Sequence, residues 1–239
     1  MNSVNQLSGN VTKLSTQGCV LFDLDGTLLD TAADFQAVLN VLCIEQGVTP
    51  PTPAAIHSTV SSGARALISL AFELEQGSDQ FDHLLQQLLD RYLDQIGRTK
   101  STLYPGMDVL LQKLESLSIP WGVVTNKPVR FSEPLLRNLQ LHNRCAVLIC
   151  PDHVTHSKPH PEPLLLACER VGRQPELSIY VGDHPRDISA GKAAGMKTIA
   201  AAYGYLPAEP CISSWGADMI VNNISEVTQL FWPVGQAVN

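Results

Sequence analysis

Short apolar segments alternate with amphipathic ones along the second part of the chain, after Tyr104-Pro105-Gly106. The apolar segments have the length of strands, and a similar one lies earlier in the chain: they are Cys19–Asp23, Trp121–Thr125, Ala146–Cys150, Ser178–Gly182, Lys197–Ala202 and Met219–Val221. Between them, apolar residues recur at helical spacing near Met107–Leu117, Ser132–Leu141, Glu162–Gly172 and Pro185–Gly195. Strands that are apolar throughout and alternate with helices are typical of a parallel sheet with both faces covered. The pattern predicts an α/β, Rossmann-like core.

The segment from Asp34 to about Gly97 departs from this alternation. It contains no convincing strand, its apolar residues recur at helical spacing, and its breaks fall at Thr49–Pro53 and Gln76–Asp79. We therefore expect an all-helical cap inserted after the first strand. The predicted division is a core of residues 18–33 and 99–233, a cap of residues 34–98, a flexible N-terminal extension of residues 1–17 and a C-terminal tail of residues 234–239.

Composition limits the range of functions. The 239 residues carry a formal charge of −7 and no basic run, which argues against binding to nucleic acid or to an anionic membrane surface. No apolar run is long enough to span a bilayer, and residues 1–17 lack the layout of a signal peptide. The six cysteines form no CxxC pair, so we expect buried free thiols in a reducing compartment. These features predict a cytoplasmic protein, and they leave its oligomeric state open.

The first predicted strand ends in an acidic motif, Asp23-Leu24-Asp25-Gly26-Thr27. Two carboxylates this close repel each other unless a cation or a shared proton relieves the repulsion. Gly26 lets the backbone approach a ligand closely. An ordinary polar turn is the alternative, because Asp and Gly are common in turns. We favour a chemical role, with one carboxylate as a metal-bound nucleophile and the other as an acid–base group.

Polar groups also follow the ends of three later strands. They are Thr125-Asn126-Lys127, Ser157-Lys158-Pro159 and the segment GDHPRD of residues 182–187. Each has an ordinary structural interpretation, as a turn, a solvated surface charge or a helix cap. In a doubly wound sheet, however, ligands bind beyond the carboxyl ends of the strands. Four such ends predict one shared site, in which Thr125 and backbone N–H groups hold phosphoryl oxygens and Lys158 adds an ammonium group.

Taken in order, these motifs resemble those of the haloacid dehalogenase superfamily, whose phosphatases use an aspartate nucleophile. The DxDGT motif falls at residues 23–27, the threonine motif at Thr125, the lysine motif at Lys158, and the GDxxxD motif at Asp183 and Asp187. Within the superfamily the chain is similar to the phosphoglycolate phosphatase group. More narrowly, the segments WGVVTNKPVRF, LICPDHV, SKPHPEPL and SSGARAL are similar to those of the N-acetylmuramic acid 6-phosphate phosphatases of cell-wall sugar recycling.

The resemblance implies a phosphomonoesterase that needs Mg²⁺ and passes through an aspartyl-phosphate. Asp23 is the expected nucleophile, and Asp25 is expected to protonate the leaving group and later to activate water. The expected Mg²⁺ ligands are the side chains of Asp23 and Asp183 and the backbone carbonyl of Asp25. Asp187 is expected to orient a metal-bound water or Lys158.

Other residues are expected to bind the substrate, a small phosphorylated sugar or organic acid. Thr125, Lys158 and backbone N–H groups near Asp25 and Asn126 would hold the phosphoryl oxygens. Arg65, in the cap segment Ser61–Arg65, is a candidate for pairing with the lactyl carboxylate of N-acetylmuramic acid 6-phosphate, because a guanidinium binds a carboxylate in a bidentate pair. An exposed helical arginine is the alternative for Arg65. The alternative substrate is 2-phosphoglycolate.

Rival chemistries have less support. The sequence has no GxSxG elbow, no P-loop and no HExxH motif. His153, His156 and His160 lack a nearby cysteine and regular helical spacing, so we expect loop histidines rather than a zinc site. A dehalogenase would not need an acid at Asp25. A sugar phosphomutase and a non-catalytic phosphosugar sensor remain open, although a sensor would usually have lost a motif residue.

Overall fold

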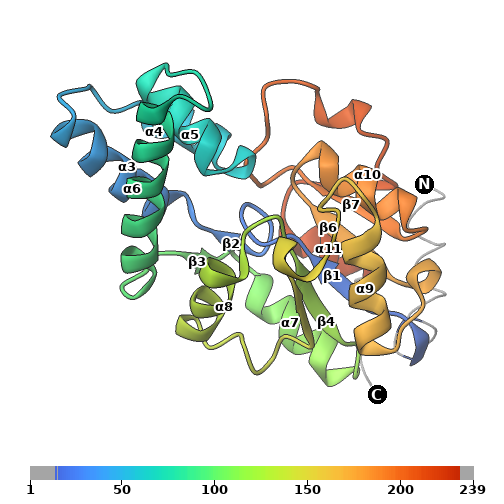
Figure 1. The fold of residues 1–239 in the computed structure, drawn as a ribbon. Helices are drawn as coiled ribbons and strands as arrows, with labels where there is room; N and C mark the ends of the chain where they lie inside the picture. Colours follow the sequence, from blue (N-terminus) through green and yellow to red (C-terminus); the bar gives the residue numbers. More distant parts are fainter. Residues whose placement is uncertain (1–13, 15, 232–239) are drawn as a thin grey trace.

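A parallel sheet forms the centre of the computed structural model, which describes residue 14 and residues 16–231 (Figure 1). Its strands are β1 (Val20–Phe22), β4 (Trp121–Val124), β5 (Val147–Ile149), β6 (Ile179–Gly182), β7 (Lys197–Ala201) and β8 (Met219–Val221). They lie in the order β5-β4-β1-β6-β7-β8, and each neighbouring pair is parallel. Along the chain, β4 and β5 are added on one side of β1, and β6, β7 and β8 are then added on the other side. The first strand therefore lies between β4 and β6. The predicted α/β core is confirmed.

Apolar side chains alternate between the two faces of this sheet. In β1, Val20 and Phe22 belong to one buried cluster, whereas Leu21 and the preceding Cys19 belong to a second. The first cluster includes side chains of α7 (Met107–Ser116), α8 (Val129–Asn138) and α11 (Ile224–Phe231), and the second includes side chains of α9 (Glu162–Val171) and α10 (Pro185–Ala193). Short 3-10 helices lie in the connections at η2 (Pro151–His153), η3 (Pro175–Leu177) and η4 (Ile212–Ser214). Both faces are buried, which explains why the strands are apolar throughout.

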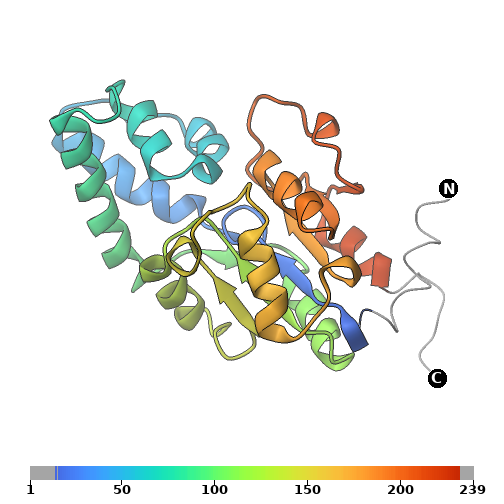
Figure 2. The same ribbon diagram turned by 45° about the vertical axis from the view of Figure 1, so that its right-hand side comes forward.

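A helical insertion lies between two short strands that were not predicted. The strands β2 (Leu29–Asp30) and β3 (Thr102–Leu103) pair antiparallel and bring the two ends of the insertion together. The helices of the insertion are α3 (Ala32–Glu45), α4 (Pro53–Thr59), η1 (Val60–Ser62), α5 (Ala64–Phe72) and α6 (Asp79–Ile96). Figures 1 and 2 show these helices gathered on one side of the sheet.

Predicted and observed elements differ mainly at their ends. Helix α8 begins at Val129 rather than at Ser132, directly after Pro128, whose fixed φ suits the start of a helix. All six cysteines are free; four are buried as expected, Cys145 is half-buried, and Cys211 is exposed. The predicted N-terminal extension and C-terminal tail fall mostly outside the described residues. Within the described part of the chain, no helix is long and apolar enough to cross a membrane.

Candidate active site

Three neighbouring strands carry the predicted site residues at their carboxyl ends. Asp23 follows β1, Thr125 follows β4 and Asp183 follows β6. The N–H of Asp23 donates to the Val181 carbonyl at 2.9 Å, so strand pairing extends up to this aspartate. Because parallel strands end at the same edge of a sheet, motifs that are far apart in the sequence meet there, as the sequence predicts.

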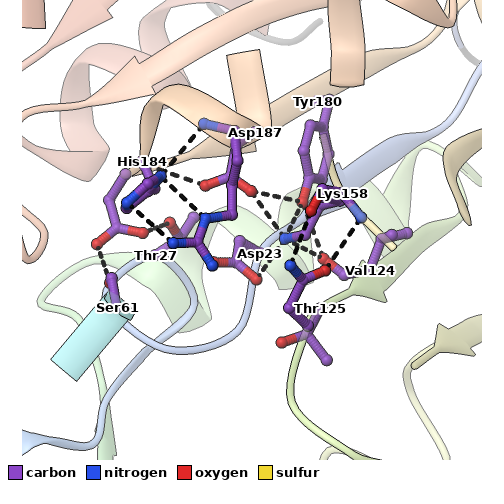
Figure 3. A network of polar contacts seen from close by, with 12 residues as sticks. Asp23, Thr27, Ser61, Val124, Thr125, Lys158, Tyr180, His184 and Asp187 are labelled. Atoms are coloured by element: carbon purple, nitrogen blue, oxygen red, sulfur yellow. Dashed lines mark hydrogen bonds and ion pairs between the residues drawn. The ribbon is translucent and has the colours of Figure 1, made fainter. Parts of the chain in front are cut away.

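The ammonium group of Lys158 lies at the centre of the site (Figure 3). It donates to Asp23 Oδ1 at 2.8 Å and lies 2.8 Å from Asp187 Oδ1. Further contacts join it to the Val124 carbonyl at 3.0 Å and to the Tyr180 hydroxyl at 2.8 Å. Burial by itself lowers the pKa of Lys158, but Asp187 and Asp23 outweigh it and hold the pKa above its usual value. Lys158 therefore stays charged against both carboxylates.

Asn126 holds the backbone of the loop that carries Lys158. Its side-chain amide donates to the Lys158 carbonyl at 2.9 Å, and its Oδ1 accepts from the Lys158 N–H at 3.2 Å. From the sequence, backbone N–H groups near Asn126 were expected to bind phosphoryl oxygens, and this role of the side chain was not predicted. The two roles use different atoms, so the same residue can serve both.

Three buried carboxylates lie close together beside Lys158. Oxygen atoms of Asp23, Asp183 and Asp187 lie within 4.8 Å of one another. Burial raises the pKa of Asp23 to about 6, with further upward contributions from Asp187 and Asp25, against the lowering effect of Lys158. Burial and the charges of Asp23 and Asp187 raise the pKa of Asp183 well above its usual value. One lysine does not neutralise three carboxylates, and oxygen atoms are the ligands that Mg²⁺ prefers. The residues fit a divalent cation.

Two glycines make room for the Asp183 carboxylate. Gly26 has φ +85°, and a Cβ atom there would lie 2.1 Å from Asp183 Oδ2. A Cβ atom on Gly204 would lie 2.2 Å from the Gly26 carbonyl oxygen and 2.4 Å from Asp183 Cβ. The same carboxylate accepts from the Thr27 hydroxyl at 3.1 Å and from the Tyr205 N–H at 2.8 Å. The Gly-Thr pair of the acidic motif thus packs directly on Asp183.

The insertion reaches the acidic cluster through Ser61, in η1. Its hydroxyl lies 2.9 Å from Asp183 Oδ2 and 3.4 Å from the backbone carbonyl oxygen of Asp25. Both atoms belong to predicted Mg²⁺ ligands. From the sequence, only Arg65 of the segment Ser61–Arg65 was expected to reach the site, and this contact of Ser61 was not predicted.

The carboxylate of Asp25 contacts a separate set of residues. Its Oδ1 accepts from the ammonium group of Lys127 at 2.8 Å and from the hydroxyl of Thr31 at 2.6 Å. Lys127 is buried and also donates to the Tyr92 hydroxyl at 2.7 Å. From the sequence, Lys127 was noted after a strand but its side chain was given no role, and Tyr92 was not predicted. Tyr92 lies on α6 of the insertion, far from the motifs in the sequence, and a lysine after a strand ordinarily lies at the surface.

A crevice of about 360 Å³ opens between the strand ends and the insertion. Asp23, Asp25, Thr125 and Lys158 line it from the core, and residues 60–65 line it from the insertion. Arg65 is among them, although its guanidinium is exposed and lies 3.8 Å from Asp82 Oδ1. The volume suits a small metabolite.

One histidine, His184, lines the crevice, and two others lie in the loop that carries Lys158. His184 caps α10, and burial together with the charge of Arg186 lowers the pKa of His184 to about 4. His156 and His160 are exposed, with ring centroids 4.7 Å apart, and Glu162 completes a group of potential metal ligands within 4.8 Å. From the sequence, a zinc site was judged by the lack of a nearby cysteine, and Glu162 was not considered as a ligand.

Comparisons with known proteins agree with this geometry. The model of the haloacid dehalogenase-like hydrolase family matches residues 20–201. The chain is 47% identical over 208 residues to the N-acetylmuramic acid 6-phosphate phosphatase of Pseudomonas aeruginosa. The matched region covers 87% of this chain and 92% of the relative. It is 41% identical over 215 residues to the phosphoglycolate phosphatase of Xanthomonas campestris pv. campestris, with 90% and 96% covered.

A solved structure gives the same result for the fold. A haloacid dehalogenase-like hydrolase of Streptococcus pneumoniae superposes with a TM-score of 0.76 at 23% identity, over 91% of this chain and 99% of that one. The family model and the two relatives together show that the chain belongs to the haloacid dehalogenase-like hydrolase family, and the predicted class of enzyme is confirmed.

Proposed function

We propose that this protein is a phosphomonoesterase that forms an aspartyl-phosphate on Asp23, with Mg²⁺ as its cofactor. The observation that carries the proposal is the buried contact between Asp23 and Lys158, beside two more carboxylates, on the lining of the crevice. A phosphomonoester is anionic and repels a carboxylate, so attack by Asp23 needs positive charge close by. Lys158 supplies one such charge at the nucleophile itself.

The acidic cluster supports the choice of cofactor. Asp23, Asp183 and the backbone carbonyl of Asp25 would hold the ion, which would supply positive charge at the phosphoryl oxygens. Asp187 lies 2.8 Å from the ammonium group of Lys158, which favours a role in orienting that lysine.

The remaining steps are assigned to residues of the crevice. Asp23 attacks phosphorus, the bond from phosphorus to the ester oxygen breaks, and Asp25 gives its proton to the departing oxygen. Asp25 then takes a proton from a water molecule as the water oxygen attacks phosphorus, and the bond from phosphorus to the Asp23 oxygen breaks and releases phosphate. The hydroxyl of Thr125 and nearby backbone N–H groups hold the phosphoryl oxygens during both steps.

For the substrate we propose N-acetylmuramic acid 6-phosphate, and for the biological role the recycling of peptidoglycan. The support is the 47% identity to the Pseudomonas aeruginosa phosphatase named for that compound and a crevice of metabolite size. The 41% identical Xanthomonas campestris enzyme is named for phosphoglycolate, which makes 2-phosphoglycolate the second candidate. Both compounds pair a phosphate with a carboxylate. We assign residues 34–98 as the cap that surrounds the leaving group, with Arg65 as the residue that binds the carboxylate.

A rate comparison tests this proposal. The substrates are N-acetylmuramic acid 6-phosphate, 2-phosphoglycolate and glucose 6-phosphate, each with wild type, Asp23→Asn and the surface control Asp218→Asn. Wild type and the control should hydrolyse the first substrate fastest, and Asp23→Asn should lose several orders of magnitude in turnover because an amide does not attack phosphorus. Turnover near the wild-type rate in Asp23→Asn would contradict the covalent mechanism. A faster rate on 2-phosphoglycolate would move the assignment to that substrate.

A further inference from the structure

Lys127 is a buried cation that the proposed mechanism does not use. Its side chain is 6% exposed, and its ammonium group lies between Asp25 of the core and Tyr92 of the insertion. We infer that Lys127 is a positioning residue, an inference that rests on the proposed function. Lys127 holds the carboxylate of Asp25 in the orientation needed for proton transfer, and it connects this carboxylate to the insertion.

The contacts of Asp25 distinguish its two oxygen atoms. Lys127 and Thr31 both donate to Oδ1, at 2.8 and 2.6 Å. Within the described residues, no hydrogen bond is made to Oδ2, and Asp25 lines the crevice. Because two donors hold Oδ1, the rotation of the carboxyl group is restricted, and Oδ2 is the atom left for the leaving oxygen. Without Lys127, only Thr31 would donate to Oδ1, and the carboxyl group could rotate more freely. Proton transfer would then be slower, because it depends on the orientation of the reacting groups.

Lys127 is itself held by side chains of the insertion. Its ammonium group donates to the Tyr92 hydroxyl at 2.7 Å and lies 4.5 Å from the centroid of the Tyr92 ring and 4.8 Å from that of Phe35. These rings stack on each other with centroids 4.1 Å apart and an interplanar angle of 6°. Phe35 lies on α3 and Tyr92 on α6. The orientation of the acid–base group in the core therefore depends on how the insertion is seated.

A purely structural cation, which joins insertion and core, is the competing explanation for these contacts. The two explanations differ in how the leaving group should matter. Loss of a structural cation slows all esters by a similar factor, whereas misplacing the proton donor slows esters with strongly basic leaving groups most. Phenyl phosphate and 4-nitrophenyl phosphate provide this comparison, because they have similar shapes and their leaving groups differ in basicity.

The experiment measures kcat/KM for both esters, since this ratio reports the step in which the leaving group departs. The variants are Lys127→Met, Tyr92→Phe and the control Lys197→Met, which removes an exposed lysine paired with Asp218 at 3.1 Å at the start of β7. Lys127→Met should lower kcat/KM for phenyl phosphate about tenfold or more beyond its effect on 4-nitrophenyl phosphate. Tyr92→Phe should shift the ratio in the same direction by a smaller factor, and Lys197→Met should not shift it.

Two results would overturn the inference. One is an equal loss on both esters in Lys127→Met with an unchanged circular dichroism spectrum. The other is a double variant of Lys127→Met and Asp25→Asn whose loss in kcat/KM equals the product of the two single losses. If Lys127 acts through Asp25, the combined loss should be smaller than that product. If Lys127→Met does not fold, the ratio in Tyr92→Phe decides, and an unshifted ratio there overturns the inference. A wild-type protein that hydrolyses no ester would overturn the proposed function itself, which separates that failure from failure of the role of Lys127.

Discussion

At the scale of residues, the site is a balance of buried charges. Lys158 contacts Asp23 and Asp187 at once, and Asp183 is left without a cation among the described residues. Removing one partner of a buried ion pair strands the other charge, which costs several kcal/mol. Loss of Lys158 would therefore destabilise the fold and, under the proposed mechanism, would also slow the reaction, and a cation at Asp183 would relieve the remaining repulsion.

Arg65 is the residue we expect to bind the carboxylate of the substrate. Its guanidinium is exposed and only loosely paired with Asp82, so it is free to reorient toward a carboxylate in the crevice. We expect Arg65→Ala to lower kcat/KM for N-acetylmuramic acid 6-phosphate about tenfold or more, with little change for 4-nitrophenyl phosphate, which has no carboxylate. Arg137→Ala, which removes another exposed arginine, is the control. Equal losses on both substrates would assign Arg65 to the phosphoryl site or to the fold.

Some site residues were predictable from sequence and others were not, for physical reasons. Asp23, Lys158 and Asp183 follow strands, and the rule that ligands bind beyond strand ends identifies them without any knowledge of packing. Lys127 also follows a strand, but its position does not predict that its buried ammonium group contacts Asp25. Ser61 does not follow a strand. The contact of Ser61 with Asp183 exists only because the insertion docks on the core, and the same docking places Tyr92 against Lys127. No periodicity in the sequence encodes that docking.

At the scale of elements, one side chain joins the two connections between insertion and core. Asp34, in the first turn of α3, is fully buried. Its Oδ1 accepts from Gln95 Nε2 at 3.0 Å and from the Lys100 N–H at 2.9 Å, and its Oδ2 accepts from the hydroxyls of Ser101, at 2.6 Å, and Thr99. The start of the insertion is thereby bonded to the segment by which the chain returns to the core. Beside it, β2 and β3 close the same junction, and two-residue strands are too short to show an alternating pattern in the sequence.

The prediction at this scale concerns Asp34→Asn. Burial by itself raises the pKa of Asp34, but the hydrogen bonds from Ser101 and Thr99 and the other donors outweigh it and hold the pKa below its usual value. In Asp34→Asn, one carboxylate oxygen becomes an NH₂ group that faces hydrogen-bond donors. We therefore expect a loss of about 2–4 kcal/mol in the free energy of unfolding. The pKa of Asp34 is lower in the folded state than in the unfolded state, where it is about 3.9. The carboxylate therefore stabilises the fold fully above about pH 4, and this stabilisation is lost as the pH falls through the folded-state pKa.

Urea unfolding at several pH values checks this prediction. The difference between wild type and Asp34→Asn should be largest near neutral pH and should shrink as the pH falls below about 4. Asp94→Asn, which changes an aspartate on the same insertion, is the control. A difference that stays constant from neutral to acid pH would mean that the ionised carboxylate is not the stabilising group.

At the scale of the whole molecule, core and insertion share one apolar interior. The cluster on the first face of the sheet continues through α8 into α3 and α6. Phe131 of α8 packs on Tyr92 of α6 with ring centroids 5.7 Å apart. The alternation of strands and helices predicts the sheet, and helical spacing predicts the insertion, but the contact between them depends on side chains from distant segments. Because the insertion reaches the predicted metal ligands through Ser61, binding of a cation and packing of the insertion act on the same part of the molecule.

The last prediction is that Mg²⁺ stabilises the whole fold. An ion that binds only the folded state raises the free energy of unfolding, by about 2.7 kcal/mol at a concentration one hundred times its Kd. Wild type after treatment with EDTA should therefore gain thermal stability on addition of Mg²⁺, whereas Asp183→Asn should gain little. Without metal, Asp183→Asn should be at least as stable as wild type, because it removes a charge from a crowded, buried cluster. Asp218→Asn, a surface change, should respond to Mg²⁺ as wild type does. Ca²⁺ should inhibit turnover, because its looser and higher coordination misplaces the phosphoryl group relative to Asp23. Equal stabilisation of wild type and Asp183→Asn by Mg²⁺ would place the ion elsewhere.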